Sequence, residues 1–307
     1  MRRCDEPCRG AAKASIKAAR PRDRPPGESR SSAASATQVD PLFLSPFPLL
    51  DPAELQACRD GLRRFETWLG GRVNGVADLK WRTMPYLFLP WAAKFALKER
   101  ILDAVKDLLG SDLLIYTATF FIKEAHSPTI AAWHQDSTYY GLEPQEAVTV
   151  WIALSEASEA AGCMEALSFR GEPRQLTHAA RVVEHSVNRA SQKIVEPLDD
   201  SRPVAMPLPA GSFSIHHGLC PHRSGHNRTG HRRIGLGLNY IATRVRPIGA
   251  VRPAAMLVRG VDRYGHFDRV VPAEREFDAE GLAVHARAVA LYRDAYLEAE
   301  ARHAQRA

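Results

Sequence analysis

The spacing of apolar residues changes character along the chain. From Asp51, an acidic helix start, to Gly70, apolar residues recur every three or four positions, which predicts a helix that ends at the glycine. Residues 95–109 repeat this spacing and stop before Gly110, so they predict a second helix. An alanine-rich amphipathic stretch over 277–304 predicts a long helix that closes the chain.

Between these helices the pattern becomes that of β-strands. Residues 147–154 place valine, isoleucine and leucine at alternate positions, as expected where one face of a strand is buried. Similar runs predict further strands over 113–123, 163–167, 204–208, 212–217 and 233–243. Short strands separated by glycine and proline are typical of a sandwich or barrel. We therefore expect a mainly β fold with flanking α-helices and a β core over about 112–245.

The first 38 residues differ in composition from the rest of the chain. Arginine, alanine, proline and serine dominate them, and burial of so few apolar groups cannot offset the entropy of ordering them. We expect a disordered basic extension over 1–38 and a single domain over 39–307. The extension carries nine basic and four acidic residues, so it accounts for most of the formal net charge of +6. A nucleic-acid binder would concentrate positive charge on a folded face, so we expect no nucleic-acid partner.

Two further features favour a cytoplasmic protein. No apolar run approaches the length of a membrane helix, and no apolar segment follows the initial Met-Arg-Arg, so we expect neither a membrane span nor a secretory signal. The five cysteines are odd in number and scattered, which disfavours a disulfide framework and fits a reducing compartment.

The stretch WHQDSTYYGL, residues 133–142, holds a histidine and an aspartate two positions apart. Side chains at i and i+2 of a strand point to the same face, so His134 and Asp136 can present two ligands to one metal ion. The same spacing is equally that of a surface histidine beside a surface aspartate. The pair alone does not decide between these two interpretations.

A third ligand has several candidates within sixteen residues: His216, His217, His222, His226 and His231. His216 and His217 are neighbours on a predicted strand, so at most one of them points inward. Spacing alone does not select His222. Two imidazoles and one carboxylate leave three positions of an octahedral ion open, which suits an Fe(II) that binds a cosubstrate and O2. A structural zinc site would be closed by four ligands instead.

Three segments, FFIKEAHSPTIAAWHQDSTYYGL, VTVWIALSEASEAAGCM and HRSGHNRTGHRR, resemble in order and spacing the phytanoyl-CoA dioxygenase family of Fe(II)- and 2-oxoglutarate-dependent oxygenases. The resemblance covers most of residues 80–265. It implies a double-stranded β-helix core of the jelly-roll or cupin-like kind. It also implies Fe(II), 2-oxoglutarate and O2 as cofactors, with ascorbate as a reductant. The implied reaction hydroxylates a substrate carbon and releases succinate and CO2. The family name implies an acyl-CoA for some members, but the sequence shows no separate CoA-binding element, so we expect an aliphatic carbon of a small metabolite or natural-product intermediate.

The resemblance further implies roles for individual residues. His134, Asp136 and His222 match the three iron ligands of the family. Arg233 stands eleven residues after His222, where the family has the arginine that binds the far carboxylate of 2-oxoglutarate. A guanidinium suits this task because it pairs a carboxylate through two parallel hydrogen bonds. Trp151 matches a family tryptophan near the cosubstrate.

Five more residues are candidates with a weaker basis. Lys123 and Ser224 are candidates to bind the cosubstrate, although a solvated strand end and an ordinary turn serine explain them as well. Gln135, Tyr139 and Tyr140, which flank the proposed metal ligands, are candidates to border the substrate pocket. All five stay predictions at this point.

One departure from the family keeps an alternative open. Relatives commonly continue beyond Gly-Cys-Met with a strand and a Pro-Gly-Ser-His segment, which this chain lacks after Met164. The alternative is a non-catalytic or differently active metal-binding jelly-roll protein. The aspartate at position 136 favours hydroxylation, because related halogenases carry alanine or glycine there.

Overall fold

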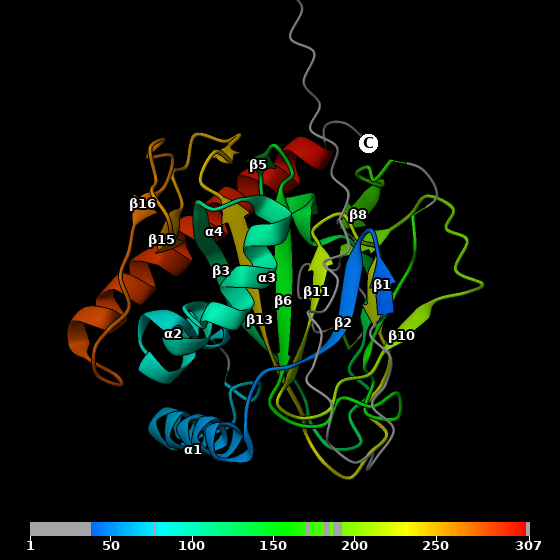
Figure 1. The fold of residues 1–307 in the computed structure, drawn as a ribbon, viewed down its shortest axis with the longest axis horizontal. Helices are drawn as coiled ribbons and strands as arrows, with labels where there is room; N and C mark the ends of the chain where they lie inside the picture. Colours follow the sequence, from blue (N-terminus) through cyan, green and yellow to red (C-terminus); the bar gives the residue numbers. More distant parts are fainter. Residues whose placement is uncertain (1–37, 77, 170–171, 181–184, 187–191, 305–307) are drawn as a thin grey trace, which may run out of the picture.

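The computed structural model describes residues 38–76, 78–169, 172–180, 185–186 and 192–304. The expected disordered extension over 1–38 lies outside these residues, except that Gln38 opens the first strand. The fold consists of two main sheets with helices against the larger one (Figure 1). This architecture agrees with the predicted mainly β class with flanking helices.

The larger sheet has eight strands, which bring together segments from both ends of the described chain. In spatial order they are β1 (Gln38–Asp40), β2 (Phe43–Pro48), β11 (Ser212–His217), β6 (Ala147–Ala153), β13 (Arg233–Ala242), β3 (Leu113–Lys123), β15 (Ala254–Arg259) and β16 (Asp268–Arg269). The long central strands β3, β6 and β13 pair antiparallel and carry most of the buried apolar side chains.

The smaller sheet has four short strands, in the order β10 (Val204–Met206), β7 (Met164–Ala166), β12 (His222–Ser224) and β4 (Ala131–His134). It faces the larger sheet, because side chains of both line one cavity. Two small ribbons, β5 (Leu142–Glu143) with β14 (Arg246–Pro247) and β8 (His178–Ala180) with β9 (Gln192–Ile194), complete the described strands.

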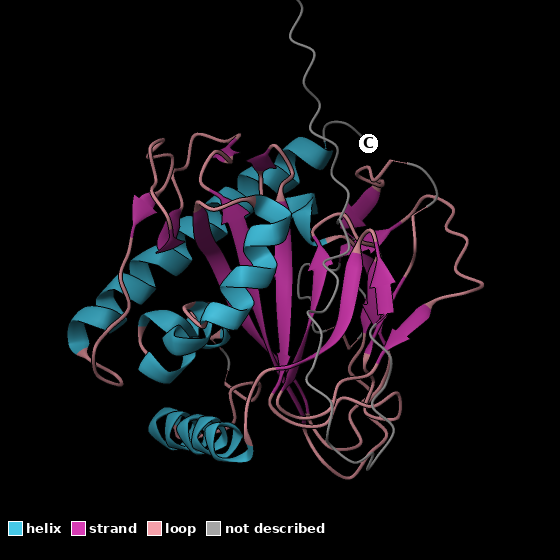
Figure 2. Ribbon diagram, viewed as in Figure 1, coloured by secondary structure: helices cyan, strands magenta, loops and turns pink. Residues whose placement is uncertain are grey.

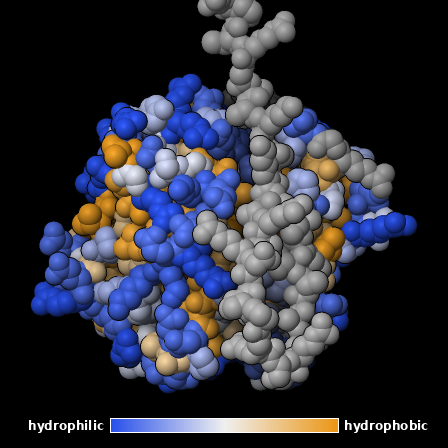
Figure 3. Space-filling view, viewed as in Figure 1, coloured by the Kyte–Doolittle hydropathy of each residue, from blue (hydrophilic) through white to orange (hydrophobic). Residues whose placement is uncertain are grey.

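Helices pack against the larger sheet (Figure 2), and the last of them borders a cavity on the sheet face that carries Thr117 and Thr149. They are α1 (Pro52–Leu69), α2 (Pro90–Ala96), α3 (Glu99–Leu109) and α4 (Ala279–Ala304), with short 3-10 turns η1 (Leu79–Arg82), η2 (Pro85–Leu87) and η3 (Asp136–Tyr139). None of the helices within the described ranges combines the length and apolar character needed to cross a membrane. On the face in Figure 3, apolar residues are scattered among hydrophilic ones.

Local sequence explains where α1 begins and ends. Asp51 accepts a hydrogen bond from the Glu54 amide at 2.8 Å, and the Glu54 carboxylate accepts one from the Asp51 amide, which forms a capping box. Gly70 ends the helix in the left-handed conformation at φ 71°, which glycine adopts without strain. The predicted boundaries of this helix are confirmed.

The prediction of one helix over 95–109 is wrong. The structure has α2 and α3 there, separated at Lys98, whose backbone is extended and precedes α3. The Lys98 amine instead bonds Glu54 of α1 at 2.6 Å. The apolar spacing continues through the break, so the pattern does not reveal it.

An aromatic cluster ties α1 to the larger sheet. Phe65 is fully buried, and its ring packs against Phe88, Phe120 and Phe277 at centroid distances of 5.2, 6.4 and 6.2 Å. These partners come from three different segments, so Phe65 links the N-terminal helix to β3 and to the chain just before α4.

Replacing Phe65 by alanine is expected to lower the free energy of unfolding by about 3–5 kcal/mol, because the cavity left behind has several rigid walls. Denaturant titration measures this. Leu97→Ala is the control, since Leu97 is 43% exposed and its loss is expected to cost less than about 1 kcal/mol. Equal effects of the two substitutions would contradict the assignment of Phe65 to the core.

Candidate metal centre and active site

Two histidines face each other across the smaller sheet. β4 and β12 pair antiparallel with His134 directly opposite His222. Each ring donates its Nδ1 hydrogen to the carbonyl two residues earlier, from His134 to Ala132 at 2.8 Å and from His222 to Cys220 at 2.9 Å. These bonds fix the tautomer in which Nε2 of each ring carries the lone pair that a metal binds.

Asp136 completes the cluster, but not as the strand argument predicted. β4 ends at His134, and Asp136 is the first residue of η3, so the two do not share a strand face. The chain turns because the Ser137 amide bonds the Gly218 carbonyl at 3.0 Å. The turn still brings Asp136 Oδ1 to 3.6 Å from Nε2 of both histidines.

The three ligand atoms lie within 4.8 Å of one another, and they are the one such group found in the described residues. Burial raises the pKa of Asp136, but the His222, His134 and His216 imidazoles outweigh it and hold that pKa well below its usual range. Burial lowers the pKa of His222 well below its ordinary value. A carboxylate and neutral imidazoles are the protonation states that a divalent metal needs, so the donor set fits Fe(II) with open positions.

The adjacent histidines His216 and His217 point to opposite faces of β11, as strand alternation predicts. His216 points toward the cluster, with Nε2 3.1 Å from Asp136 Oδ2. His217 points to the other face, where its Nδ1 accepts the Leu219 amide at 3.1 Å. Burial lowers the pKa of His217 to about 4, so it is neutral at physiological pH.

Arg233 lies at the other end of the same cavity. The side chain is 3% exposed, and its guanidinium lies 5.3 Å from the centre of the Trp151 ring. It donates one hydrogen bond to the Gly162 carbonyl at 2.6 Å, while its buried Nε has no partner. Burial lowers its pKa to about 10. No carboxylate pairs with Arg233 in the part of the chain that the structure describes.

A second buried basic side chain lies beside Arg233. Lys123 is opposite it in the β3–β13 register and is fully buried, so the alternative of a solvated strand end is wrong. Its amine donates to Ser224 Oγ at 2.8 Å and to the Gly225 carbonyl. Burial, aided by the Arg233 charge, lowers the pKa of Lys123 to about 6.

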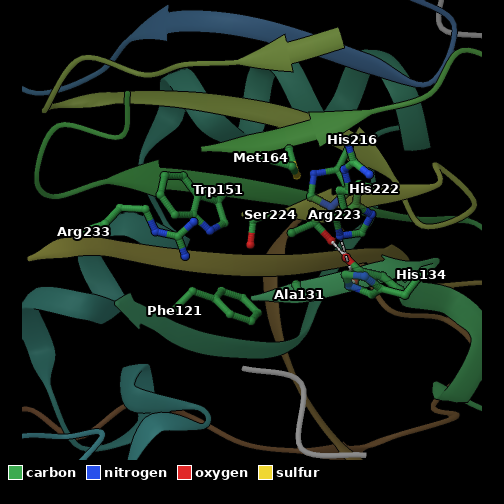
Figure 4. Close-up of a pocket in the computed structure, with 12 residues that line it drawn as sticks. Phe121, Ala131, His134, Trp151, Met164, His216, His222, Arg223, Ser224 and Arg233 are labelled. Carbon is green, nitrogen blue, oxygen red and sulfur yellow. Dashed lines mark hydrogen bonds and ion pairs between the residues drawn. The ribbon is translucent and has the colours of Figure 1, made fainter. Parts of the chain in front are cut away.

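A narrow cavity joins these groups (Figure 4). His134 and His222 lie at one end and Arg233 with Trp151 at the other, while Ser224 and Phe121 lie between them. A larger cavity of about 670 Å³ shares Phe121, His134, Asp136 and Thr149 with the narrow one, so the two meet at the cluster.

Of the residues predicted to border the substrate pocket, some line a cavity and others do not. Tyr140 lines the larger cavity, while the side chain of Tyr139 lies outside those that the structure describes. Gln135 does not border either cavity, so that prediction is wrong. Its side chain is fully buried and bonds the Leu219 carbonyl at 2.6 Å and the Leu176 amide at 2.7 Å. The strand alternation that brings His134 to the cluster turns Gln135 away from it.

Two polar neighbours shape the turn before β13. Asn227 fixes it through donation to the Glu124 and His231 carbonyls at 2.9 and 2.7 Å. Arg232 points away from the cavity and bonds Glu66 at 2.7 Å.

The family model for phytanoyl-CoA dioxygenase (PhyH) matches residues 43–235, more than half of the chain. The chain belongs to the phytanoyl-CoA dioxygenase family. A curated relative, the probable alpha-ketoglutarate-dependent hypophosphite dioxygenase of Stutzerimonas stutzeri, is 25% identical over 217 residues, which are 68% of this chain and 71% of that protein.

Solved structures agree with this membership. The non-heme monooxygenase ThoJ, in its apo form, is 30% identical with a TM-score of 0.73 and covers 84% of this chain and 95% of its own. CytC3 with Fe(II) and alpha-ketoglutarate, at 20% identity and a TM-score of 0.55 over 77% of this chain and 91% of its own, shares the fold. The chain is therefore a 2-oxoglutarate-dependent non-haem iron dioxygenase with a double-stranded β-helix core.

Sequence reasoning missed three residues that contact the cluster or its neighbours. Thr149 donates to Asp136 Oδ2 at 2.6 Å, and Asn239 donates to Thr149 at 2.7 Å. His216 was weighed only as a ligand, not as a partner of Asp136. The alternation in β6 places Thr149 on the same face as Trp151, and this was the available signal.

Gly235 leaves room for Trp151 against Arg233. A Cβ at this position would lie 1.9 Å from Trp151 Cζ2, so Gly235→Ala must displace the indole. We expect 2-oxoglutarate affinity to fall roughly 10- to 30-fold through the lost contact with Arg233. Fe(II) affinity should change little, because the cluster lies at the far end of the cavity.

Calorimetric titration with 2-oxoglutarate and with Fe(II) measures both quantities. Gly225→Ala is the matched control, because a Cβ there meets nothing within 4 Å. A Gly235→Ala protein that binds the keto acid like the wild type would show that the indole does not support Arg233.

Proposed function

We propose that this enzyme hydroxylates a small organic molecule, with Fe(II) bound by His134, Asp136 and His222 and the far carboxylate of 2-oxoglutarate bound by Arg233. One observation carries the proposal. A metal-ligand cluster and a buried arginine without a carboxylate partner lie at opposite ends of one cavity. A keto acid with a second carboxylate is a ligand that satisfies both ends at once.

The charges in the cavity support this ligand. Arg233 and Lys123 are both buried basic side chains, and the Arg233 charge without an anion nearby is costly. A dicarboxylate supplies the missing negative charge. The free Arg233 Nε and its neighbouring nitrogens suit bidentate pairing, and Ser224, held by Lys123, offers a further hydroxyl inside the cavity.

The chain's own residues prepare the site for chemistry that the cofactors supply. Iron, keto acid and O2, when bound, provide the oxidation of a C–H bond. His134 and His222 keep their Nε2 atoms directed inward through their Nδ1 bonds, and Asp136 stays ionised. Three protein ligands leave the other coordination positions to the cosubstrate and O2. Trp151 packs against the Arg233 guanidinium, which would shield its pair with a bound carboxylate from water.

The larger cavity suits an organic substrate. Its volume of about 670 Å³ is in the range of pockets that hold drug-sized molecules. Its wall beside the cluster is polar, with Thr117, Thr119, Thr149 and Asn239 from β3, β6 and β13, and the Thr117 hydroxyl has no partner. The relative named for hypophosphite acts on a phosphorus with two oxygens, which would fill little of this space. The substrate proposed here is therefore larger and carries hydrogen-bonding groups.

We also propose a reducing, cytoplasmic setting, with ascorbate as a reductant that keeps the iron ferrous. The described cysteines, Cys58, Cys163 and Cys220, are free and buried. Burial raises the pKa of Cys58 and of Cys163 to about 11, so both remain thiols at neutral pH. The complete donor set at the cluster argues against the alternative of a non-catalytic jelly-roll protein.

Asp136→Ala and His222→Ala test the metal centre. Each is expected to lower Fe(II) affinity by at least roughly 100-fold and to abolish the formation of succinate from 2-oxoglutarate, because a ligand is lost. Metal analysis and succinate assay without added substrate measure these effects. His226→Ala, which removes an exposed histidine outside the metal-ligand cluster, should match the wild type. Unchanged metal content in Asp136→Ala would contradict the assignment of Asp136 as a metal ligand.

Arg233→Gln tests the cosubstrate site. We expect its Kd for 2-oxoglutarate to rise roughly 100-fold, because a buried charge pair is lost, while Fe(II) still binds. The adjacent Arg232→Gln serves as the control, since Arg232 pairs with Glu66 and Glu124 outside the cavity. The proposal fails if both variants bind the keto acid equally well.

A further inference from the structure

The two carboxylate oxygens of Asp136 have different surroundings. Oδ1 faces the histidine pair at 3.6 Å, whereas Oδ2 lies 2.6 Å from the Thr149 hydroxyl and 3.1 Å from Nε2 of His216. An ionised carboxylate accepts hydrogen bonds and donates none. Both Thr149 and His216 therefore direct a hydrogen at Oδ2.

A third residue fixes the direction of this donation. Asn239 donates its amide hydrogen to Thr149 Oγ at 2.7 Å, so the Thr149 hydroxyl accepts on one side and gives its own hydrogen to Asp136. Thr149, Asn239 and His216 come from β6, β13 and β11 of the larger sheet. The histidine ligands come from the smaller sheet, so Asp136 is held from both sides.

A carboxylate binds a metal through one oxygen or through both. If Oδ2 turned to the metal, it would occupy one of the positions that the cosubstrate and O2 need. That turn would also break two charge-assisted hydrogen bonds, and both donors are buried.

We propose that Thr149 and His216 are positioning residues that keep Asp136 bound to the metal through Oδ1 alone. The inference rests on the proposed function, and it assigns roles to two residues that are not ligands. His216 Nε2 is directed at Oδ2, and His216 is not part of the group of mutually close ligand atoms in the described residues.

The first test replaces Thr149 in the full-length protein loaded with Mn(II), an ion that accepts oxygen ligands. Water-proton relaxation counts the waters on the bound ion. The wild type should show roughly three, one for each open position, and Thr149→Val should show roughly two, because the freed oxygen binds the metal. Its 2-oxoglutarate affinity should fall roughly 10-fold. Thr149→Ser keeps the hydroxyl and should restore both values.

The second test replaces His216. His216→Leu removes the donor and should behave like Thr149→Val, while His216→Gln retains an N–H of similar reach and should recover the wild-type water count. Ser214→Ala and His217→Gln are matched controls on the same strand, because neither side chain contacts Asp136. Thermal unfolding of the metal-free variants identifies any that fail to fold.

Two results would overturn the proposal. One is a Thr149→Val, His216→Leu double variant with the wild-type water count and keto-acid affinity. The other is loss of Mn(II) from His216→Leu that glutamine does not restore, since that would make His216 a ligand. Succinate formation by the wild type tests the proposed function separately, so its absence would be distinguished from a failure of this inference alone.

Discussion

The site depends on the antiparallel pairing of β4 with β12. Both strands are short, and their register sets His134 opposite His222, so a slip of one residue would turn one imidazole to the other face of the sheet. The carbonyls of Ala132 and Cys220 then orient the two rings from their own strands. Backbone geometry therefore positions both imidazoles.

The larger sheet contributes the other half of the site. Asp136 is held against it by Thr149 and His216, and the β3–β13 register places Lys123 beside Arg233 at the far end of the cavity. The fold thus places the metal-ligand cluster and the buried Arg233 guanidinium at opposite ends of one cavity. With a divalent metal bound at the cluster, this arrangement would favour a ligand with an anionic group at each end.

Sequence patterns predicted the long elements well. β3 matches the strand over 113–123 that its aromatic and β-branched residues indicate, and α1 ends at the predicted glycine. The short strands β4 and β12, which carry the ligands, are too brief to show one. The proposed iron ligands were identified through the family resemblance, and the strand explanation for Asp136 was wrong because the chain turns after His134.

Tertiary contacts determine the surroundings of the other candidate residues, Lys123 and Gln135. The sequence left two explanations for Lys123, a solvated strand end and a residue that binds the cosubstrate. Its burial becomes visible only in the structure, where Ser224 of β12 and Gly225 in the following turn contact its amine. Gln135 sits between two ligands in the sequence yet bonds a distant loop. Contacts between segments a hundred residues apart leave no local pattern.

The buried amine of Lys123 makes the free energy of unfolding depend on pH. Burial lowers its pKa to about 6 from an ordinary value of 10.5. Between these two values the unfolded chain holds a proton that the folded protein has released, so the free energy of unfolding rises as pH rises through this window. Below about pH 6 the amine is protonated in both states and this dependence disappears. The ligand-free protein is therefore more stable against unfolding at alkaline pH than at neutral pH. A bound dianion would favour the protonated Lys123 amine and would extend this stability toward neutral pH.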